Sequence, residues 1–306
     1  MRISTNLYFS TLNQRLSDQQ NKISTLQTQL ASGKKAPTPS VDPEAAMASL
    51  RMNSVLEDQA NYKSTLQKVD GQLRQEESLI SAMRKISDRI QELSITAANG
   101  TYSAEDKAMI AAEVAQYKEQ LFAYANSKDE NGNYLFAGAK SSTQPFAMSA
   151  DGSVTYQGDQ TAVFVSLGEG EKMRVNTIGS ELLGGVSRIS DDGSTVKVSA
   201  FTMIDDFVTA LNGDEATNIS RAMADAESLS SSLSKKQVEL GIAQNSVVNR
   251  LDINEEKTIL YKDILSKSVD TDYTAVITEL STNMLALEAA QSTFAKVSQL
   301  SLFDYL

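Results

Sequence analysis

The stretch that decides the fold is residues 12–30, which read LNQRLSDQQNKISTLQTQL. Its apolar residues recur at alternating intervals of four and three, the spacing of the a and d positions of a coiled coil, with one polar position, Gln19. The seam consists of Leu12, Leu16, Gln19, Ile23, Leu26 and Leu30. Gly33 and Pro37 follow, so the pattern predicts a helix over residues 5–31 whose apolar face needs a partner.

The C-terminal end carries a matching pattern. Its residues again alternate at intervals of four and three, interrupted by the polar Gln291, and predict a helix over residues 273–301. The seam positions are Leu280, Met284, Leu287, Gln291, Phe294, Ser298 and Ser301. Residues 1–35 carry five basic groups and one acidic group, whereas residues 271–306 carry one basic and four acidic groups. We expect the terminal helices to pair with each other or with copies of themselves, stabilised by about 1.5–3 kcal/mol for each fully buried large apolar side chain.

Between the ends, helical spacing of apolar residues predicts further helices. They cover residues 44–98, 104–127 and 218–266, together with a short helix that ends at Asn212-Gly213. Asp42 is the expected N-cap of the first of these helices.

The middle of the chain changes from helical to strand-like spacing. Ten of the fifteen glycines lie between Gly132 and Gly193, and short β-prone runs alternate there with turns that contain glycine and aspartate. The runs are residues 154–156, 163–167, 173–175 and 196–198. This pattern predicts a small antiparallel β domain inserted between helices.

Together these patterns predict a mainly helical, elongated chain: a rod with an inserted β domain and a coiled-coil helix at each end. A continuous helix over residues 44–98 would be about 80 Å long, against a radius of gyration of about 19 Å for a compact chain of this length. Gly71 is the weakest point of such a helix. The expected segments are an N-terminal assembly helix with a Pro-rich turn (1–43), two halves of a helical rod (44–130 and 201–270), the β domain (131–200) and a C-terminal assembly helix (271–306).

Composition removes whole classes of function. The 306 residues include no cysteine and no histidine, which excludes disulfides, thiolate and imidazole catalysis, and the usual zinc and iron–sulfur ligand sets. With 28 basic against 39 acidic residues, we expect no nucleic-acid partner and no membrane partner. No apolar run has the length of a transmembrane helix, and the first residues do not form a usual signal peptide. Such a chain is cytoplasmic by default, unless it leaves by a route that needs no cleaved signal.

Several fragments resemble ligand-binding motifs but lack essential residues. Residues 129–133 begin like a calcium loop, yet Tyr134 and Lys140 occupy the positions that require glycine and glutamate. Residues 168–170 lack the third glycine of a dinucleotide fingerprint, and Gly185 stands where a P-loop requires lysine. We therefore predict no enzyme, no metal and no cofactor. A pair of catalytic carboxylates assembled only by the fold stays open at this point.

Four stretches resemble elements of the flagellin family. LQTQLASGKK at residues 26–35 is similar to the Leu-Ser-Ser-Gly turn after the first helix, and DPEAA at 42–46 is similar to the Asp-Asp-Ala-Ala continuation. ELSITAANGT at 92–101 resembles Glu-Leu-x-x-Gln-Ala-x-Asn-Gly-Thr, with Thr96 in place of glutamine. DTDYT at 270–274 resembles the element that opens the last helix. The resemblance implies a flagellin-like fold whose terminal helices form an inner coiled coil.

Two further stretches indicate one branch of this family, the junction proteins between flagellar hook and filament. DENGNYLFAG at residues 129–138 and TQPF at 143–146 are similar to a signature of that branch, and LFDYL at 302–306 differs from the usual flagellin ending. The resemblance implies a structural junction protein, secreted unfolded by type III export to the bacterial flagellum, that forms a short ring on the hook. The implied partners are copies of itself, neighbouring hook-associated and flagellin subunits, and an export chaperone on the C-terminal helix.

Two alternatives stay open. The chain could be a flagellin, the subunit of the filament. From a different class, it could be a secreted helical effector or translocator of a related export system, whose apolar helices would meet membranes or host proteins. For the junction protein, we expect the self-assembly contacts at Leu12, Leu16, Ile23, Leu26, Leu30, Leu280, Met284, Leu287 and Phe294.

Overall fold

The computed structural model describes residues 2–36, 38, 40, 42–99, 102–166, 172–190, 193–213 and 215–303. Its contacts divide the chain into two compact units. Unit 1 comprises Met1–Ala60 and Glu255–Leu306, so both ends of the chain belong to it, and unit 2 comprises Asn61–Asn254. The five segments expected from the sequence are a finer division, and they remain a prediction.

Most of the described residues are helical. The helices are α1 (Arg2–Ser32), α2 (Pro43–Ala97), α3 (Ala104–Ala125), α4 (Gly179–Leu183), α5 (Ala200–Gly213), α6 (Ala216–Val269) and α7 (Tyr273–Phe303). The predicted helices are confirmed, and α2 continues through Gly71 without a break. None of the helices, in the ranges described, has a stretch apolar enough to cross a membrane.

Side-chain caps fix where several of these helices begin. Ser103 Oγ accepts a hydrogen bond from the backbone N–H of Asp106 at 3.2 Å, and the Asp106 carboxylate accepts one from the N–H of Ser103 at 3.0 Å. This reciprocal pair is the capping box that starts α3. Asp42 Oδ1 accepts from the N–H of Ala45 at 2.9 Å, which confirms the predicted N-cap of α2.

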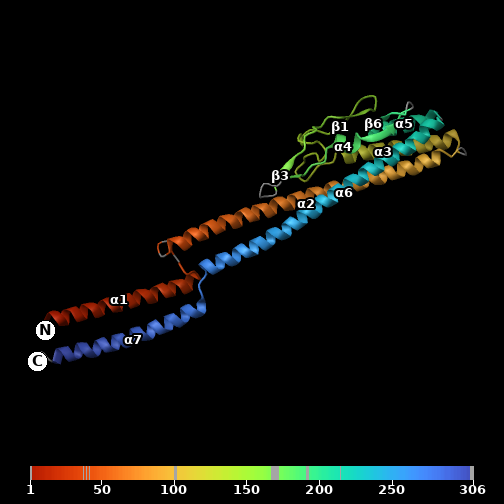
Figure 1. Ribbon diagram of the computed structural model, residues 1–306. Coiled ribbons are helices and arrows are strands. Elements are labelled where there is room, and N and C mark those ends of the chain that lie inside the picture. Colours follow the sequence, from red (N-terminus) through yellow and green to blue (C-terminus); the bar gives the residue numbers. More distant parts are fainter. Residues whose placement is uncertain are drawn as a thin grey trace. The chain divides into compact units, whose positions relative to one another are not determined.

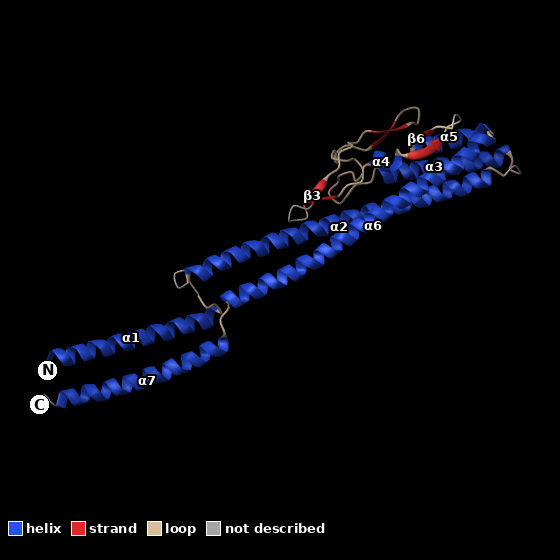
Figure 2. Cartoon of the chain, viewed as in Figure 1, coloured by secondary structure: helices blue, strands red, loops and turns tan. Residues whose placement is uncertain are grey.

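The predicted β region consists of three separate antiparallel hairpins (Figure 2, strands in red). They pair β1 (Phe146–Met148) with β2 (Val154–Tyr156), β3 (Phe164–Ser166) with β4 (Lys172–Arg174), and β5 (Val186–Ile189) with β6 (Thr195–Val198). The turns of the first and last hairpins contain Gly152 and Gly193, whose φ angles of +84° and +80° favour glycine. Strands β2, β3, β4 and β6 overlap the predicted runs, whereas β1 and β5 lie outside them.

Unit 2 has one apolar core that joins its helices to the hairpins. Phe136, Phe201 and Phe207 are fully buried in it. The ring of Phe146 in β1 lies 5.4 Å from the ring of Phe201 in α5 and 5.2 Å from that of Tyr156 in β2, measured between centroids. These aromatic contacts anchor the first hairpin to α5.

Glu76 of α2 is an ionisable residue buried in this core. Its carboxylate accepts hydrogen bonds from Thr177 Oγ1 at 2.6 Å and from Gln72 Nε2 at 3.1 Å. Thr177 lies between β4 and α4, so the first bond ties the β region to α2. Burial raises the pKa of Glu76, and the two hydrogen bonds and the charge of Lys236 oppose this rise only in part.

Replacing Glu76 by glutamine should remove a pH dependence of stability. The pKa of Glu76 is raised in the folded chain above the value of about 4.3 expected of an unfolded one, so protonation of Glu76 stabilises the fold at low pH. That contribution is lost as the pH rises through the folded pKa. We therefore measure the melting temperature of the Glu76→Gln variant minus that of wild type at two pH values. We expect this difference to be larger at neutral pH than at about pH 4.

The matched control is Glu57→Gln, which changes an exposed carboxylate on the same helix. It should show the same melting difference from wild type at both pH values. A Glu76→Gln variant that behaves like this control would contradict the assigned effect of burial.

Candidate assembly interface

In unit 1 the two terminal helices lie side by side (Figure 1). Lys22 Nζ of α1 lies 2.8 Å from Glu279 Oε1 of α7. Lys34, just after α1, forms a backbone bridge with Asp270, just before α7. The number of the partner residue thus rises as the number in α1 falls, so the helices are antiparallel. The sequence predicts that the terminal helices pair with each other or with copies of themselves. In the structure they pair with each other.

The stripe of α1 that faces α7 is the one that the heptad spacing predicts. Leu26 is buried, and Leu12, Leu16, Gln19, Ile23 and Leu30 are half-buried. The residues between these positions are exposed, except for the half-buried Gln29. A two-helix pair covers only one stripe of each helix, which explains why most of these side chains keep part of their surface in water.

The stripe of α7 differs from the predicted seam at two positions. Its half-buried residues are Val276, Leu280, Asn283, Leu287, Ala290 and Phe294. The prediction that Met284 and Gln291 lie in the seam is wrong, because both are exposed, Met284 to 52%. The predicted seam positions Ser298 and Ser301 lie outside the side chains that the structure describes. Eight of the nine candidate contact residues thus come together in one seam, and Met284 lies beside it.

A polar pair explains why α7 turns this stripe toward α1 instead of the predicted one. Gln19 Nε2 donates hydrogen bonds to Asn283 Oδ1 at 2.8 Å and to the Asn283 carbonyl at 3.2 Å. The apolar residues of α7 fit both the predicted and the observed stripe, but only the observed stripe places an amide opposite Gln19. Sliding either helix by one turn would leave both amides facing apolar side chains, so the pair fixes the register. The heptad spacing of apolar residues did not identify Asn283, because Asn283 is polar. Its signal in the sequence is its position, four residues before the seam residue Leu287.

The segments that connect the paired ends to α2 and α6 also bind each other. The N–H of Lys35 donates to the carbonyl of Val269 at 2.8 Å, and the N–H of Thr271 donates to the carbonyl of Gly33 at 2.9 Å. We call residues 33–35 with 269–271 the connector bridge. Gly33 has a φ of +69°, and a Cβ there would lie 2.8 Å from Tyr273 Oη, so both the backbone and the space favour glycine.

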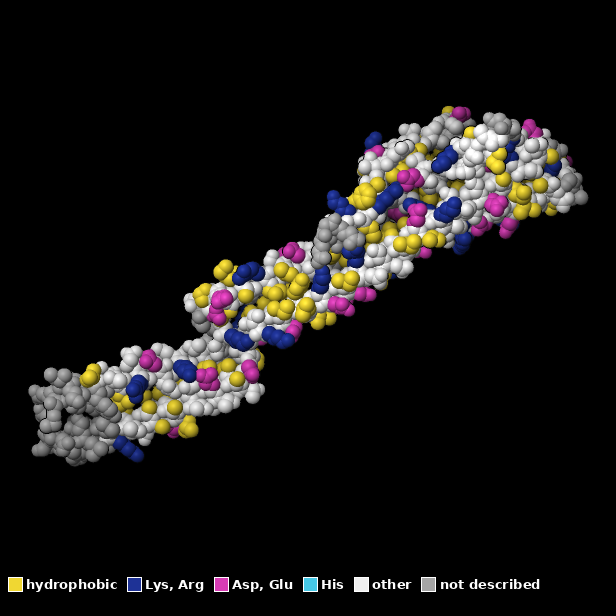
Figure 3. Space-filling view, viewed as in Figure 1, with side chains coloured by type: hydrophobic (Ala, Val, Ile, Leu, Met, Phe, Trp, Pro, Cys, Tyr) yellow, Lys and Arg dark blue, Asp and Glu magenta, His cyan; other side chains and the backbone are white. Residues whose placement is uncertain are grey.

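Apolar side chains also reach the surface of unit 1 outside the seam. Figure 3 shows them (yellow) over the segments of α2 and α6 next to the connectors. The large exposed ones in α2 and α7 of this unit are Met47, Leu50, Tyr273, Ile277, Met284 and Leu285. Exposed apolar side chains gathered in this way are typical of a surface that contacts another protein.

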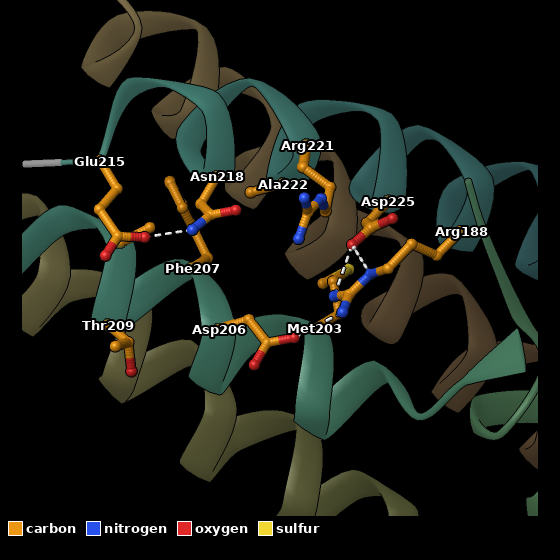
Figure 4. A pocket seen from close by; sticks show the side chains of 11 residues that line it. Arg188, Met203, Asp206, Phe207, Thr209, Glu215, Asn218, Arg221, Ala222 and Asp225 are labelled. Atoms are coloured by element: carbon orange, nitrogen blue, oxygen red, sulfur yellow. Dashed lines mark hydrogen bonds and ion pairs between the residues drawn. The ribbon is translucent and has the colours of Figure 1, made fainter. Parts of the chain in front are cut away.

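A polar pocket in unit 2 is occupied by the chain's own ion pairs (Figure 4). Arg188 of β5 lies 2.7 Å from the buried carboxylate of Asp225 in α6 and 2.6 Å from the exposed carboxylate of Asp206 in α5. These pairs fasten the last hairpin to two helices, so the pocket is explained as a structural joint. Within the described residues, no group of three or more Asp and Glu side chains could hold a metal ion.

Removing one member of the polar pair should weaken the pairing of α1 with α7. In the Gln19→Ala variant the Asn283 amide loses its partner and gains no large apolar contact, and we expect a loss of about 0.5–1.5 kcal/mol, the usual net contribution of one hydrogen bond. Hydrogen exchange of the α1 backbone measures this as faster exchange.

Gln20→Ala is the matched control, because Gln20 is exposed and does not face α7. Its α1 amides should exchange at the wild-type rate. Equal exchange in the Gln19→Ala and Gln20→Ala variants would show that the polar pair does not hold the seam.

Known proteins resemble this chain over nearly its whole length. Residues 3–141 match the family model of the bacterial flagellin N-terminal helical region. The chain is 28% identical over 318 residues to flagellar hook-associated protein 3 of Salmonella typhimurium, covering 99% of each chain. It is 25% identical over 321 residues to the protein of the same name from Escherichia coli, again covering 99% of each.

A solved structure shares the fold. Hook-associated protein 3 from Legionella pneumophila superposes with a TM-score of 0.65 over 71% of this chain and 97% of that one, at 18% identity. The predicted fold class, mainly helical with an inserted β region and helices at both ends, is thereby confirmed. The resemblance of this chain to the flagellin family, and within it to hook-associated protein 3, is confirmed as well.

Proposed function

We propose that this chain is a structural protein of the bacterial flagellum that joins the hook to the filament. The observation that carries the proposal is the similarity to two proteins named flagellar hook-associated protein 3 over 99% of each chain. The same similarity favours a junction protein over a flagellin or a secreted effector, and a structural role over an enzymatic one.

The contacts of unit 1 support a mechanism of assembly. A large apolar side chain contributes about 1.5–3 kcal/mol only when it is fully buried, and most of the seam is half-buried in the single chain. Neighbouring subunits that cover the α1 and α7 pair would bury the rest. The residues proposed for these contacts are Leu12, Leu16, Ile23, Leu26, Leu30, Leu280, Met284, Leu287 and Phe294. Among them Met284 is the most available, whereas Leu26 is already buried against α7.

The proposal includes export of the unfolded chain by the flagellar type III apparatus and assembly as a ring on the hook, beside flagellin and other hook-associated subunits. The absence of cysteine supports it, because no disulfide can block unfolding. The exposed apolar residues of α7 support an export chaperone on that helix, since they need covering before assembly.

Deleting residues 277–306 should prevent assembly, because it removes most of the α7 stripe. In cells whose own copy of the gene is deleted, we expect the truncated chain to leave hooks without filaments, seen by electron microscopy, and flagellin released into the medium. The helical circular dichroism of unit 2 should persist in the purified truncated chain, since its core uses no residue of α7.

Full-length chain in the same cells is the control and should restore filaments. Filaments grown on the truncated chain would contradict the proposal. Extensive polymerisation of the purified full-length chain on filament fragments would instead identify it as a flagellin.

A further inference from the structure

A groove opens beside the connector bridge in unit 1. It has a volume of about 300 Å³ and lies between the connector, the start of α2 and the end of α6. Small residues, Ala36, Ala45, Ala46 and Ser49, line much of it, and Leu50 beside them is 71% exposed. We call this the connector groove. A groove of small side chains with an apolar rim fits one or two large apolar side chains of a partner.

A second apolar surface lies on α7, beside its seam. Ile277 and Met284 are each 52% exposed and seven residues apart, so they share one side of the helix, and Leu285 next to them is 68% exposed. Glu288 lines one shallow groove with Met284 and Leu285, next to Leu287 and Gln291 of α7 and Ile23 of α1. We call Ile277, Met284, Leu285 and Glu288 the α7 flank.

Met284, Leu285 and Glu288 of the α7 flank cannot reach the connector groove of their own chain. The groove is lined by Val269, close to where α7 begins at Tyr273. Met284 lies eleven residues further along, which places it about 17 Å away along a straight helix. Because α7 runs antiparallel to α1 and leads away from the connector, only a second copy can bring this flank to the groove.

The charges of the two surfaces are complementary. Lys34 lines the connector groove, and Glu288 belongs to the α7 flank. Both side chains are exposed, and among the residues that the structure describes neither forms an ion pair. Two unpaired charges of opposite sign, each next to an apolar patch, favour contact between the patches in one orientation.

We propose that copies of this chain bind head to tail, with Met284 and Leu285 of one copy in the connector groove of the next and Glu288 facing Lys34. The inference rests on the proposed function and names the contact through which the copies form their ring. Because the two surfaces differ, a bound pair of copies leaves one groove and one flank free, so the contact repeats.

This contact is too small to hold a stable dimer by itself. A stable interface buries about 1,200–2,000 Å² in total, whereas the groove admits only one or two side chains. The chain should therefore stay monomeric in dilute solution and assemble where a template aligns several copies.

Cysteine cross-linking tests the contact directly, because the natural chain has no cysteine. Purified full-length Leu50→Cys and Leu285→Cys variants are mixed at high concentration and oxidised. The control mixture combines Ile242→Cys with Leu285→Cys, because Ile242 is 65% exposed and lies outside both surfaces. We expect disulfide-linked dimers to form about tenfold faster from the test mixture than from this control. A chain carrying both Leu50→Cys and Leu285→Cys should form a ladder of higher oligomers, because a head-to-tail contact repeats.

Charge reversal supplies the second measurement. Lys34→Glu and Glu288→Lys should each slow formation of the Leu50–Leu285 cross-link, and the two together should restore it. Lys85→Glu is the control, because Lys85 is exposed and belongs to unit 2, whereas the groove and the flank belong to unit 1. It should leave the rate unchanged.

Three results would overturn the inference. They are cross-linking of the mixture at the control rate, equally fast cross-linking of Leu285→Cys with itself, and failure of the double charge reversal to restore the rate. None of these affects the proposed function, which is tested separately by filament growth on the truncated chain and by polymerisation on filament fragments.

Discussion

Unit 1 depends on the burial of one apolar stripe of α1 against one apolar stripe of α7. Without this pairing, two helices of 31 residues each would expose their seams to water, and helices of this length gain most of their stability from packing. The Gln19–Asn283 pair sets the register of the seam, and the connector bridge fixes the end of the pair next to α2 and α6. Together they hold the two ends of the chain in one defined arrangement.

The two units differ in how completely they bury their apolar residues. In unit 2 the hairpins and α3, α5 and α6 close around α2, and even the polar joints at Glu76 and Arg188 are satisfied within the chain. In unit 1 only Leu26 of the α1 stripe is fully buried, and large apolar side chains of α2 and α7 remain exposed. Among the described residues, Leu26 is the only buried large apolar side chain of unit 1, whereas unit 2 has an extensive core of its own. A unit with so little core of its own is suited to assembly with neighbouring subunits.

Much of the fold could be predicted because local signals determine it. Glycine, proline and capping residues mark the helix ends, and the α1 seam follows from spacing alone. The phase of α7 could not be predicted in the same way, because its apolar residues fit two seams and Gln19, some 264 positions away, selects one. Strand β5 is positioned by Arg188 and its distant carboxylates, and the buried Glu76 by Thr177, so neither had a local signal. For the same reason Met284, one of the candidate contact residues, lies beside the seam and is 52% exposed.

The most direct measurement is a reconstruction by electron cryomicroscopy of the hook–filament junction assembled from this chain. The account predicts that α1 and α7 of each copy stay paired through Gln19 and Asn283, and that neighbouring copies cover the rest of the seam. A junction in which α1 of one copy pairs with α7 of another, or in which the pair contacts no neighbour, would contradict it.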